Sequence, residues 1–160
     1  MTRRALFQAA FSATLPLRGQ PGDFARRIFV RANELRVARG AGELKWSEPL
    51  ARCALEQCER REALRFAGHV DPERGGVAER LEAAGIRWAT CAENLFKMRG
   101  YDDPANFAIV FWWYSLGHQA NMVNPAFTDT GVAVTQGADG TFFVTQIFTL
   151  PAPPGVRLRR

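Results

Sequence analysis

Apolar residues recur at helical spacing near the beginning of the chain. In residues 24–39, Phe24, Ile28 and Leu35 form an apolar stripe, and arginines occupy the opposite face. Gly40 follows, and glycine commonly ends a helix because it adopts left-handed backbone conformations without strain. The spacing therefore predicts an amphipathic helix over 24–39.

Two further helices are predicted downstream. Ser47 is a good helix N-cap and Pro49 suits the first turn, so a helix is expected over 47–66. A shorter helix is expected over about 76–84, where Gly85 ends it. The first of these segments carries the apolar residues Leu50, Ala54, Leu55, Cys58 and Leu64.

The most apolar segment is 103–116. Asp103 and Pro104 form a cap and first-turn pair, and the residues that follow are apolar almost all round. The pattern predicts a buried helix through Leu116, after which Gly117 can end it. The expected core residues of this segment are Phe107, Phe111, Trp112 and Trp113.

β-rich runs follow the helices. Residues 86–96 look extended in part, and the runs 130–135 and 141–150 are joined by the polar, glycine-containing segment 136–140, which predicts a hairpin. The connections are not regular βαβ crossovers, so the sheet is expected to be mostly antiparallel. The prediction is one α+β domain over 21–150, a three-layer α/β/α sandwich.

Composition supports a globular protein. The chain has 160 residues, 47% of them hydrophobic and 23% charged, which is enough for one domain with a core. Its net charge is +5, and solvated arginine-rich helix faces explain most of that charge. Basic residues are not interleaved with aromatic ones, so no nucleic acid partner is expected. The sequence has no apolar run of about 18 residues and predicts no transmembrane span.

The two ends of the chain differ in composition from the domain. Residues 1–20 begin with Arg3 and Arg4 before a moderately apolar stretch, a pattern typical of an export signal. The alternative is a short amphipathic or disordered leader, since no clean Ala-x-Ala cleavage site follows. Residues 151–160 are expected to form a flexible basic tail. We expect an exported protein, periplasmic or extracellular.

The chain contains three cysteines, Cys53, Cys58 and Cys91. Cys53 and Cys58 are five residues apart on one predicted helix and point to different faces. One of them could pair with Cys91, but an odd count leaves a thiol over. Free buried cysteines are the favoured interpretation.

Three residues are the main candidates for site chemistry. The chain has only two histidines, His69 and His118, and each lies near the end of a predicted element. Glu93 lies between them in an otherwise apolar segment, where a buried carboxylate needs a partner. The partner of Glu93 could be a histidine, a metal or one of the many arginines. The three residues could converge on one cleft.

Four motifs occur in one order along the chain. They are His-Val-Asp-Pro at 69–72, Ala-Glu-Asn-Leu at 92–95, Trp-x-x-Ser-x-Gly-His-x-x-Asn-Met at 112–122 and Val-Thr-Gln-Ile-Phe at 144–148. In this the chain resembles the CAP superfamily of cysteine-rich secretory, antigen 5 and pathogenesis-related proteins, in its bacterial form. The resemblance covers about 24–149. It implies an α/β/α sandwich, export and a His/Glu cleft.

The sequence departs from the plant and animal pattern at two positions. Their second histidine comes later, where this chain has Phe143, and their second glutamate follows the helix tryptophan, where this chain has Ser115. The resemblance therefore implies a reduced metal site of His69, Glu93 and His118. Such a site would hold zinc or another divalent metal with an open coordination position.

Three functions are open at this point. The favoured one is binding of an unknown ligand, a lipid, peptide or surface component, in the His/Glu cleft. The second is a hydrolase that uses metal-bound water with Glu93, Ser115 with His118, or Cys91 with His69. The third is a structural surface-interaction domain. No nucleophile elbow or His-Glu-x-x-His helix is present, so catalysis is not favoured.

Overall fold

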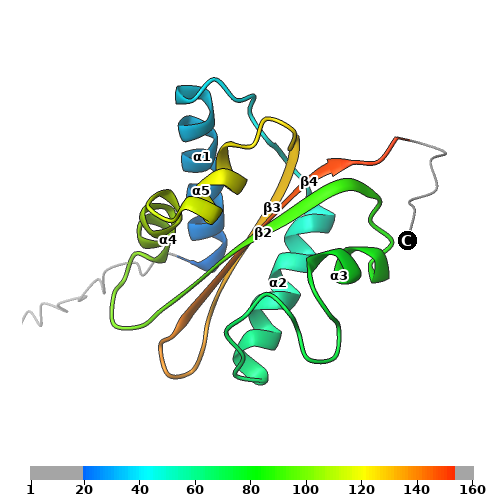
Figure 1. The fold of residues 1–160 in the computed structure, drawn as a ribbon. Coiled ribbons are helices and arrows are strands. Elements are labelled where there is room, and N and C mark those ends of the chain that lie inside the picture. Colours follow the sequence, from blue (N-terminus) through cyan, green and yellow to red (C-terminus); the bar gives the residue numbers. More distant parts are fainter. Residues whose placement is uncertain (1–19, 154–160) are drawn as a thin grey trace, which may run out of the picture.

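A computed structural model describes residues 20–153. The predicted leader and basic tail fall on residues 1–19 and 154–160, which lie outside this range, so both stay predictions. The described chain contains five helices and four strands, and it ends with two consecutive strands (Figure 1). Their bounds are α1 Pro21–Ala38, β1 Lys45–Trp46, α2 Glu48–Ala63, α3 Val77–Ala83, β2 Trp88–Met98, α4 Pro104–Trp113, α5 Leu116–Val123, β3 Asp129–Gln136 and β4 Phe142–Pro151.

The four strands form one sheet in the order β1-β3-β4-β2. The pairs β3–β4 and β2–β4 are antiparallel, whereas β1 runs parallel to β3, with Lys45 opposite Asp129. The sheet is therefore mixed, and the expectation of a mostly antiparallel sheet was wrong. A strand of two residues has no alternating pattern to detect, and only its backbone bonds reveal it: the Lys45 amide donates to the Thr128 carbonyl at 2.8 Å.

Helices cover both faces of this sheet. In Figure 1, α1, α4 and α5 lie on one side, and α2 and α3 lie on the other. Side chains alternate along β4: Val144 and Phe148 join the hydrophobic cluster under α1, α4 and α5, whereas Phe143 and Ile147 join the cluster under α2 and α3. The chain is one α+β domain with two apolar clusters.

The predicted helix over 103–116 is two helices. The helix α4 ends at Trp113, and Ser115 adopts an extended conformation that starts α5, so Gly117 lies inside a helix instead of ending one. Trp112 is fully buried as expected, but Phe107 is 40% exposed and Phe111 is 50% exposed. The expectation of all-round burial was wrong because only one side of α4 packs on the sheet.

The helix α2 lies very close to β3. A Cβ atom built on Gly131 would come within 2.1 Å of the backbone nitrogen of Ala51, so only glycine fits at this crossing. At its other end α2 finishes at Ala63, a turn earlier than predicted, and Arg65 takes a left-handed conformation with φ 54°. The chain thus leaves α2 before Gly68 and enters a loop that carries His69.

The three cysteines are free, as favoured from the sequence. Cys53 and Cys58 are buried, and Cys91 is half-buried. Burial raises the pKa of the Cys58 thiol to about 12, so this thiol stays protonated and packs as a small apolar group. No helix within residues 20–153 has the length and apolar character needed to cross a membrane.

Candidate functional site

The loop that carries His69 is anchored to α2 through Asp71. The Arg60 guanidinium forms a two-point ion pair with the Asp71 carboxylate, including an Nη2–Oδ1 contact of 2.8 Å. Asp71 Oδ1 also accepts bonds from the backbone amides of Glu73 and Arg74, at 2.9 and 3.1 Å. Arg60 holds the pKa of Asp71 well below its usual range. The loop therefore has a defined position against the end of α2.

Glu93 meets both a histidine and an arginine. Its side chain is 1% exposed, and Oε1 lies 3.0 Å from His69 Nδ1. Its second oxygen, Oε2, forms an ion pair with Arg80 Nη2, and Arg80 Nη1 donates to the His69 carbonyl at 3.0 Å. The sequence left a histidine and an arginine as alternative partners of Glu93, and the structure contains both.

His118 lies in the first turn of α5. Its Nδ1 is 2.8 Å from the hydroxyl of Ser115. The Asn94 amide donates to the His118 carbonyl at 3.0 Å, and the Asn121 amide donates to Asn94 Oδ1 at 2.9 Å. Burial lowers the pKa of His118, and the nearby His69 lowers it further. His118 is therefore biased toward the neutral form.

The two histidines meet across the edge of the sheet. Glu93 and Asn94 are consecutive in the edge strand β2, so their side chains point to opposite faces. His69 comes from the α2–α3 side to meet Glu93, and His118 comes from the α5 side above Asn94. The ring centroids of His69 and His118 are 6.5 Å apart and tilted by 36°. The ring of Phe111 lies 5.6 Å from that of His118.

One known protein family matches most of the described residues. The model of the cysteine-rich secretory protein family, CAP, matches residues 30–148. The chain belongs to the CAP family. The family expected from the four motifs is thus confirmed.

Individual relatives are more distant. The uncharacterized membrane protein YlbC of Bacillus subtilis (strain 168) is 29% identical over 109 residues, which cover 68% of this chain and 31% of YlbC. This chain therefore spans about a third of that relative.

Two solved structures have a fold similar to that of this chain, although their sequences differ from it at most positions. An extracellular protein containing an SCP domain from Bacillus anthracis str. Ames has a TM-score of 0.71 at 23% identity, covering 81% of this chain and 41% of its own. An outer surface protein from Borrelia burgdorferi has a TM-score of 0.76 at 15% identity, covering 84% of this chain and 97% of its own. At these identities the likeness establishes the fold alone.

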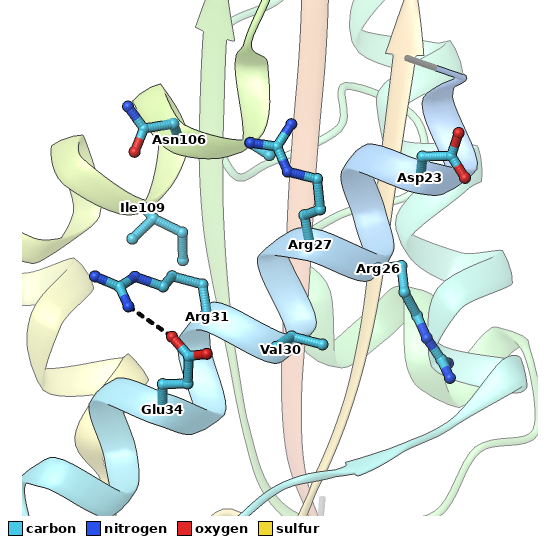
Figure 2. A pocket seen from close by; sticks show the side chains of 9 residues that line it. Asp23, Arg26, Arg27, Val30, Arg31, Glu34, Asn106 and Ile109 are labelled. Carbon is cyan, nitrogen blue, oxygen red and sulfur yellow. Dashed lines mark hydrogen bonds and ion pairs between the residues drawn. The ribbon is translucent and has the colours of Figure 1, made fainter.

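A concave region of the CAP domain lies between α1 and α4. Figure 2 shows this pocket of about 600 Å³, with Arg27 and Arg31 extending from α1 toward α4. Arg31 is paired with Glu34 at 2.6 Å, and Arg27 with Asp103 at 2.8 Å. Both of these cations therefore already have acidic partners.

The three predicted metal ligands do not form a ready ligand set. Among the described residues, no group of three or more His, Cys, Asp or Glu side chains could hold a metal ion. One tetrahedral zinc ion sets two imidazole centroids about 5 Å apart, less than the 6.5 Å between His69 and His118. The oxygens of Glu93 are also engaged by His69 and Arg80. Metal binding by His69, Glu93 and His118 stays a prediction.

The two nucleophile alternatives, Cys91 with His69 and Ser115 with His118, are supported to different degrees. Burial raises the pKa of the Cys91 thiol to about 11, so it carries little of the thiolate that attacks a substrate. Ser115 does lie within hydrogen-bond distance of His118. No carboxylate forms an ion pair with His118 in residues 20–153, so the third member of a triad is absent from the described site.

Two residues were not assigned to the site from the sequence. Arg80 was hidden because the chain has many arginines, and only the three-dimensional packing of α3 on β2 selects one of them for Glu93. Phe111 was assigned to the core, although it is half exposed beside His118. The pairing of Ser115 with His118, named from the sequence as a nucleophile and base, corresponds to a direct contact of 2.8 Å.

Proposed function

We propose that this CAP domain is a binding domain whose recognition centre is the histidine pair, His69 and His118. The observation that carries the proposal is the way both rings are held. Because a carboxylate only accepts hydrogen bonds, Glu93 fixes the proton of His69 on Nδ1 and leaves Nε2 with a free lone pair. In the tautomer where Nδ1–H of His118 donates to the Ser115 hydroxyl, the Nε2 of His118 is available as well.

This arrangement supports divalent cation binding by two imidazoles. Histidine ligands commonly donate the other ring N–H to a carboxylate, which is the relation of His69 to Glu93. In this proposal Glu93 orients His69 instead of ligating the ion itself. His69 and His118 would need to approach each other by roughly 1.5 Å to share one zinc ion. The bound ion would offer an open position to a donor atom of the ligand.

Binding is favoured over catalysis because Glu93 is poorly placed to act as a base. It is buried, both its oxygens have partners, and Arg80 neutralises its charge. A proton acceptor needs an accessible atom within reach of the substrate. The family's second glutamate position is Ser115 here, which supplies no replacement charge.

The surroundings of the histidines favour a ligand with an apolar part. Val70, which follows His69, is 67% exposed, Phe111, beside the His118 ring, is 50% exposed, and Leu116, two residues before His118, is 88% exposed. Exposed apolar side chains around polar groups are typical of binding sites. A lipid, peptide or surface component fits this chemistry.

We also propose that the protein acts outside the cytoplasm. The twin arginines of the leader support export, and so do the similar folds of an extracellular protein of Bacillus anthracis and an outer surface protein of Borrelia burgdorferi. Terminal sequencing of the protein from its native host would test this, since an exported form should lack residues before about Gln20.

Zinc titration of untagged protein by calorimetry tests the histidine pair. We expect saturable binding at about pH 7.5 that weakens as the pH falls through the histidine range, because each ligating imidazole must be neutral. His69→Ala and His118→Ala should each abolish it. Ser115→Ala is the matched control, since it keeps both rings and should retain binding. Undiminished zinc affinity in the double histidine variant would refute the proposal.

The second candidate is a hydrolase with Ser115 as nucleophile and His118 as base, favoured by their 2.8 Å contact. It predicts turnover of small esters that Ser115→Ala abolishes. The binding proposal predicts no such turnover and unchanged zinc affinity in the same variant, so one protein preparation separates the two.

A further inference from the structure

Arg61 is a buried cation without an acidic partner. It lies in the last turn of α2, and only 2% of its surface is exposed. Its Nη1 donates to the carbonyls of Phe96 and Val144, at 3.3 and 3.2 Å. Within residues 20–153, Nε has no hydrogen-bond partner and no carboxylate forms an ion pair with this guanidinium. An unpaired buried charge is costly, so its retention needs a reason.

The other buried arginines of the domain are better satisfied. Arg36 is fully buried and donates four bonds to backbone carbonyls, between 2.7 and 3.0 Å long. Arg80 pairs with Glu93. Even the exposed Arg27 and Arg31 of the pocket in Figure 2 have acidic partners. Arg61 alone among these five combines burial with an unfilled charge.

A pocket opens beside Arg61 at the end of α2. It has a volume of about 560 Å³ and adjoins the β3–β4 hairpin. Arg65 and Lys97 also line it, are exposed, and form no ion pair with a described residue. The guanidinium of Arg61 and the amine of Lys97 lie 5.6 and 5.3 Å from the ring centroid of Phe143. Three cations thus line the pocket, and two of them lie close to the ring of Phe143.

The acids of this pocket do not neutralise those cations. Asp139 accepts a bond from the Thr141 amide at 2.9 Å and forms an ion pair at 3.5 Å with Arg99, which does not line this pocket. Glu62 is the other acid in the lining, and it forms no ion pair with Arg61, Arg65 or Lys97. The local charge is therefore net positive where Arg61 lacks a partner.

We propose that this pocket binds an oxyanion group, a carboxylate or a phosphate. Of the Arg61 nitrogens, Nη2 donates to no described residue and can reach an oxygen of such a group, whereas Nε, on the same edge of the guanidinium, is buried. In Arg61 the opposite nitrogen, Nη1, is committed to the sheet, which fixes the plane of the guanidinium. Arg65 and Lys97 supply the remaining positive charge. The site is separate from the histidine pair and shares no residue with it.

Thermal unfolding in the presence of sodium phosphate or sodium acetate tests this site. Ionic strength is held constant with sodium chloride, so that general screening is the same in every sample. An anion that binds only the folded state raises the Tm with its concentration. We expect such a rise for at least one of the two anions, and the two titrations show which oxyanion the pocket prefers.

The informative variant is Arg65→Ala/Lys97→Ala, which removes two exposed cations and leaves the core intact. We expect its anion affinity to fall at least about tenfold, because two charge-assisted contacts are lost. Arg26→Ala/Arg52→Ala is the matched control: it has the same net charge, both residues are exposed, and it should respond like the parent.

A direct measurement keeps the test independent of stability. The Arg61 Nε–H resonance, assigned with Arg61→Lys, should shift on addition of the anion in the parent and much less in Arg65→Ala/Lys97→Ala. An equal Tm response in all three proteins, or no response to either anion beyond that to chloride, would overturn the proposal.

Discussion

The two faces of the sheet are filled in different ways. Under α1, α4 and α5 the core consists of large apolar side chains, among them Ile28, Trp112 and Phe148, each almost fully buried. The buried charge on this side, Arg36, has four carbonyl partners. Under α2 and α3 a smaller apolar cluster is interleaved with charged and amide side chains, including Arg61 and Arg80.

Unsatisfied polar atoms follow the same division. Of the described buried side-chain atoms without partners, those of Gln57, Arg61, Arg80, Trp88 and Thr135 lie on the α2–α3 side. Among these atoms of residues 20–153, only Gln146 Oε1 lies on the other side. Each such atom costs about 1–3 kcal/mol. The buried polar atoms on the α1 side are therefore nearly all satisfied. On the α2 side, unsatisfied atoms lower the free energy of unfolding, and this side carries Arg61 of the proposed anion pocket and the Glu93–Arg80 pair beside His69.

The largest effect is expected from Arg36→Met. The change leaves four buried carbonyls without donors, so we expect a loss of about 4 kcal/mol or more in the free energy of unfolding. Urea unfolding measures this loss. Arg31→Met, on the exposed face of the same helix, should change stability by less than about 0.5 kcal/mol. Similar losses in both variants would contradict the role given to Arg36.

Glu93→Gln should cost less, about 3 kcal/mol. It leaves Arg80 as a buried cation without its counter-charge, although Arg80 keeps its bonds to backbone carbonyls. Glu82→Gln, an exposed change on α3, serves as the control in the same urea experiment. A near-neutral result for Glu93→Gln would mean that the α2 side does not depend on this ion pair.

Asp71→Asn should have a smaller effect that depends on pH. Because the folded-state pKa of Asp71 is lowered by Arg60, its contribution is present above the unfolded pKa of about 3.9 and is lost as the pH falls toward the folded value. The Tm difference between parent and variant should therefore shrink between about pH 5 and pH 2. A difference that stays constant over this range would contradict the assigned ion pair.

The smallest expected effect is in the titration of His118. Its pKa should lie below the usual value of about 6.5, chiefly because of burial and secondarily because of His69. Its stability contribution is therefore present above that value and is lost as the pH falls below it. In His69→Gln the NMR-measured pKa of His118 should rise only part of the way. A full return would show that burial is not the main cause.

Most elements of the fold could be predicted from the sequence because their signals are local. The caps Ser47 and Asp103 and the apolar spacing located α2 and α4 within a few residues. The strand β1 was missed because two residues carry no periodicity. The break at Ser115 was missed because the apolar run continues through Tyr114 and Leu116, and only packing on the sheet decides where α4 must stop.

The candidate site was predictable in part. The motifs selected His69, Glu93 and His118, and the structure brings the first two into contact and the third within 6.5 Å of His69, ring to ring. Arg80 could not be selected, because its role depends on how α3 lies against β2. The unpaired Arg61 was equally hidden, since a sequence does not state which cations lack partners.

The position of Glu93 and Asn94 on an edge strand has a consequence for folding fidelity. The strands β2 and β4 are paired residue by residue from Thr90 to Met98. A slip of one residue would turn Glu93 toward α5 and Asn94 toward α3, because side chains alternate between faces. Both histidines would then lose the contacts that hold them. Contacts of both His69 and His118 that form together during folding would thus report that the edge strand β2 has paired with β4 in its native register.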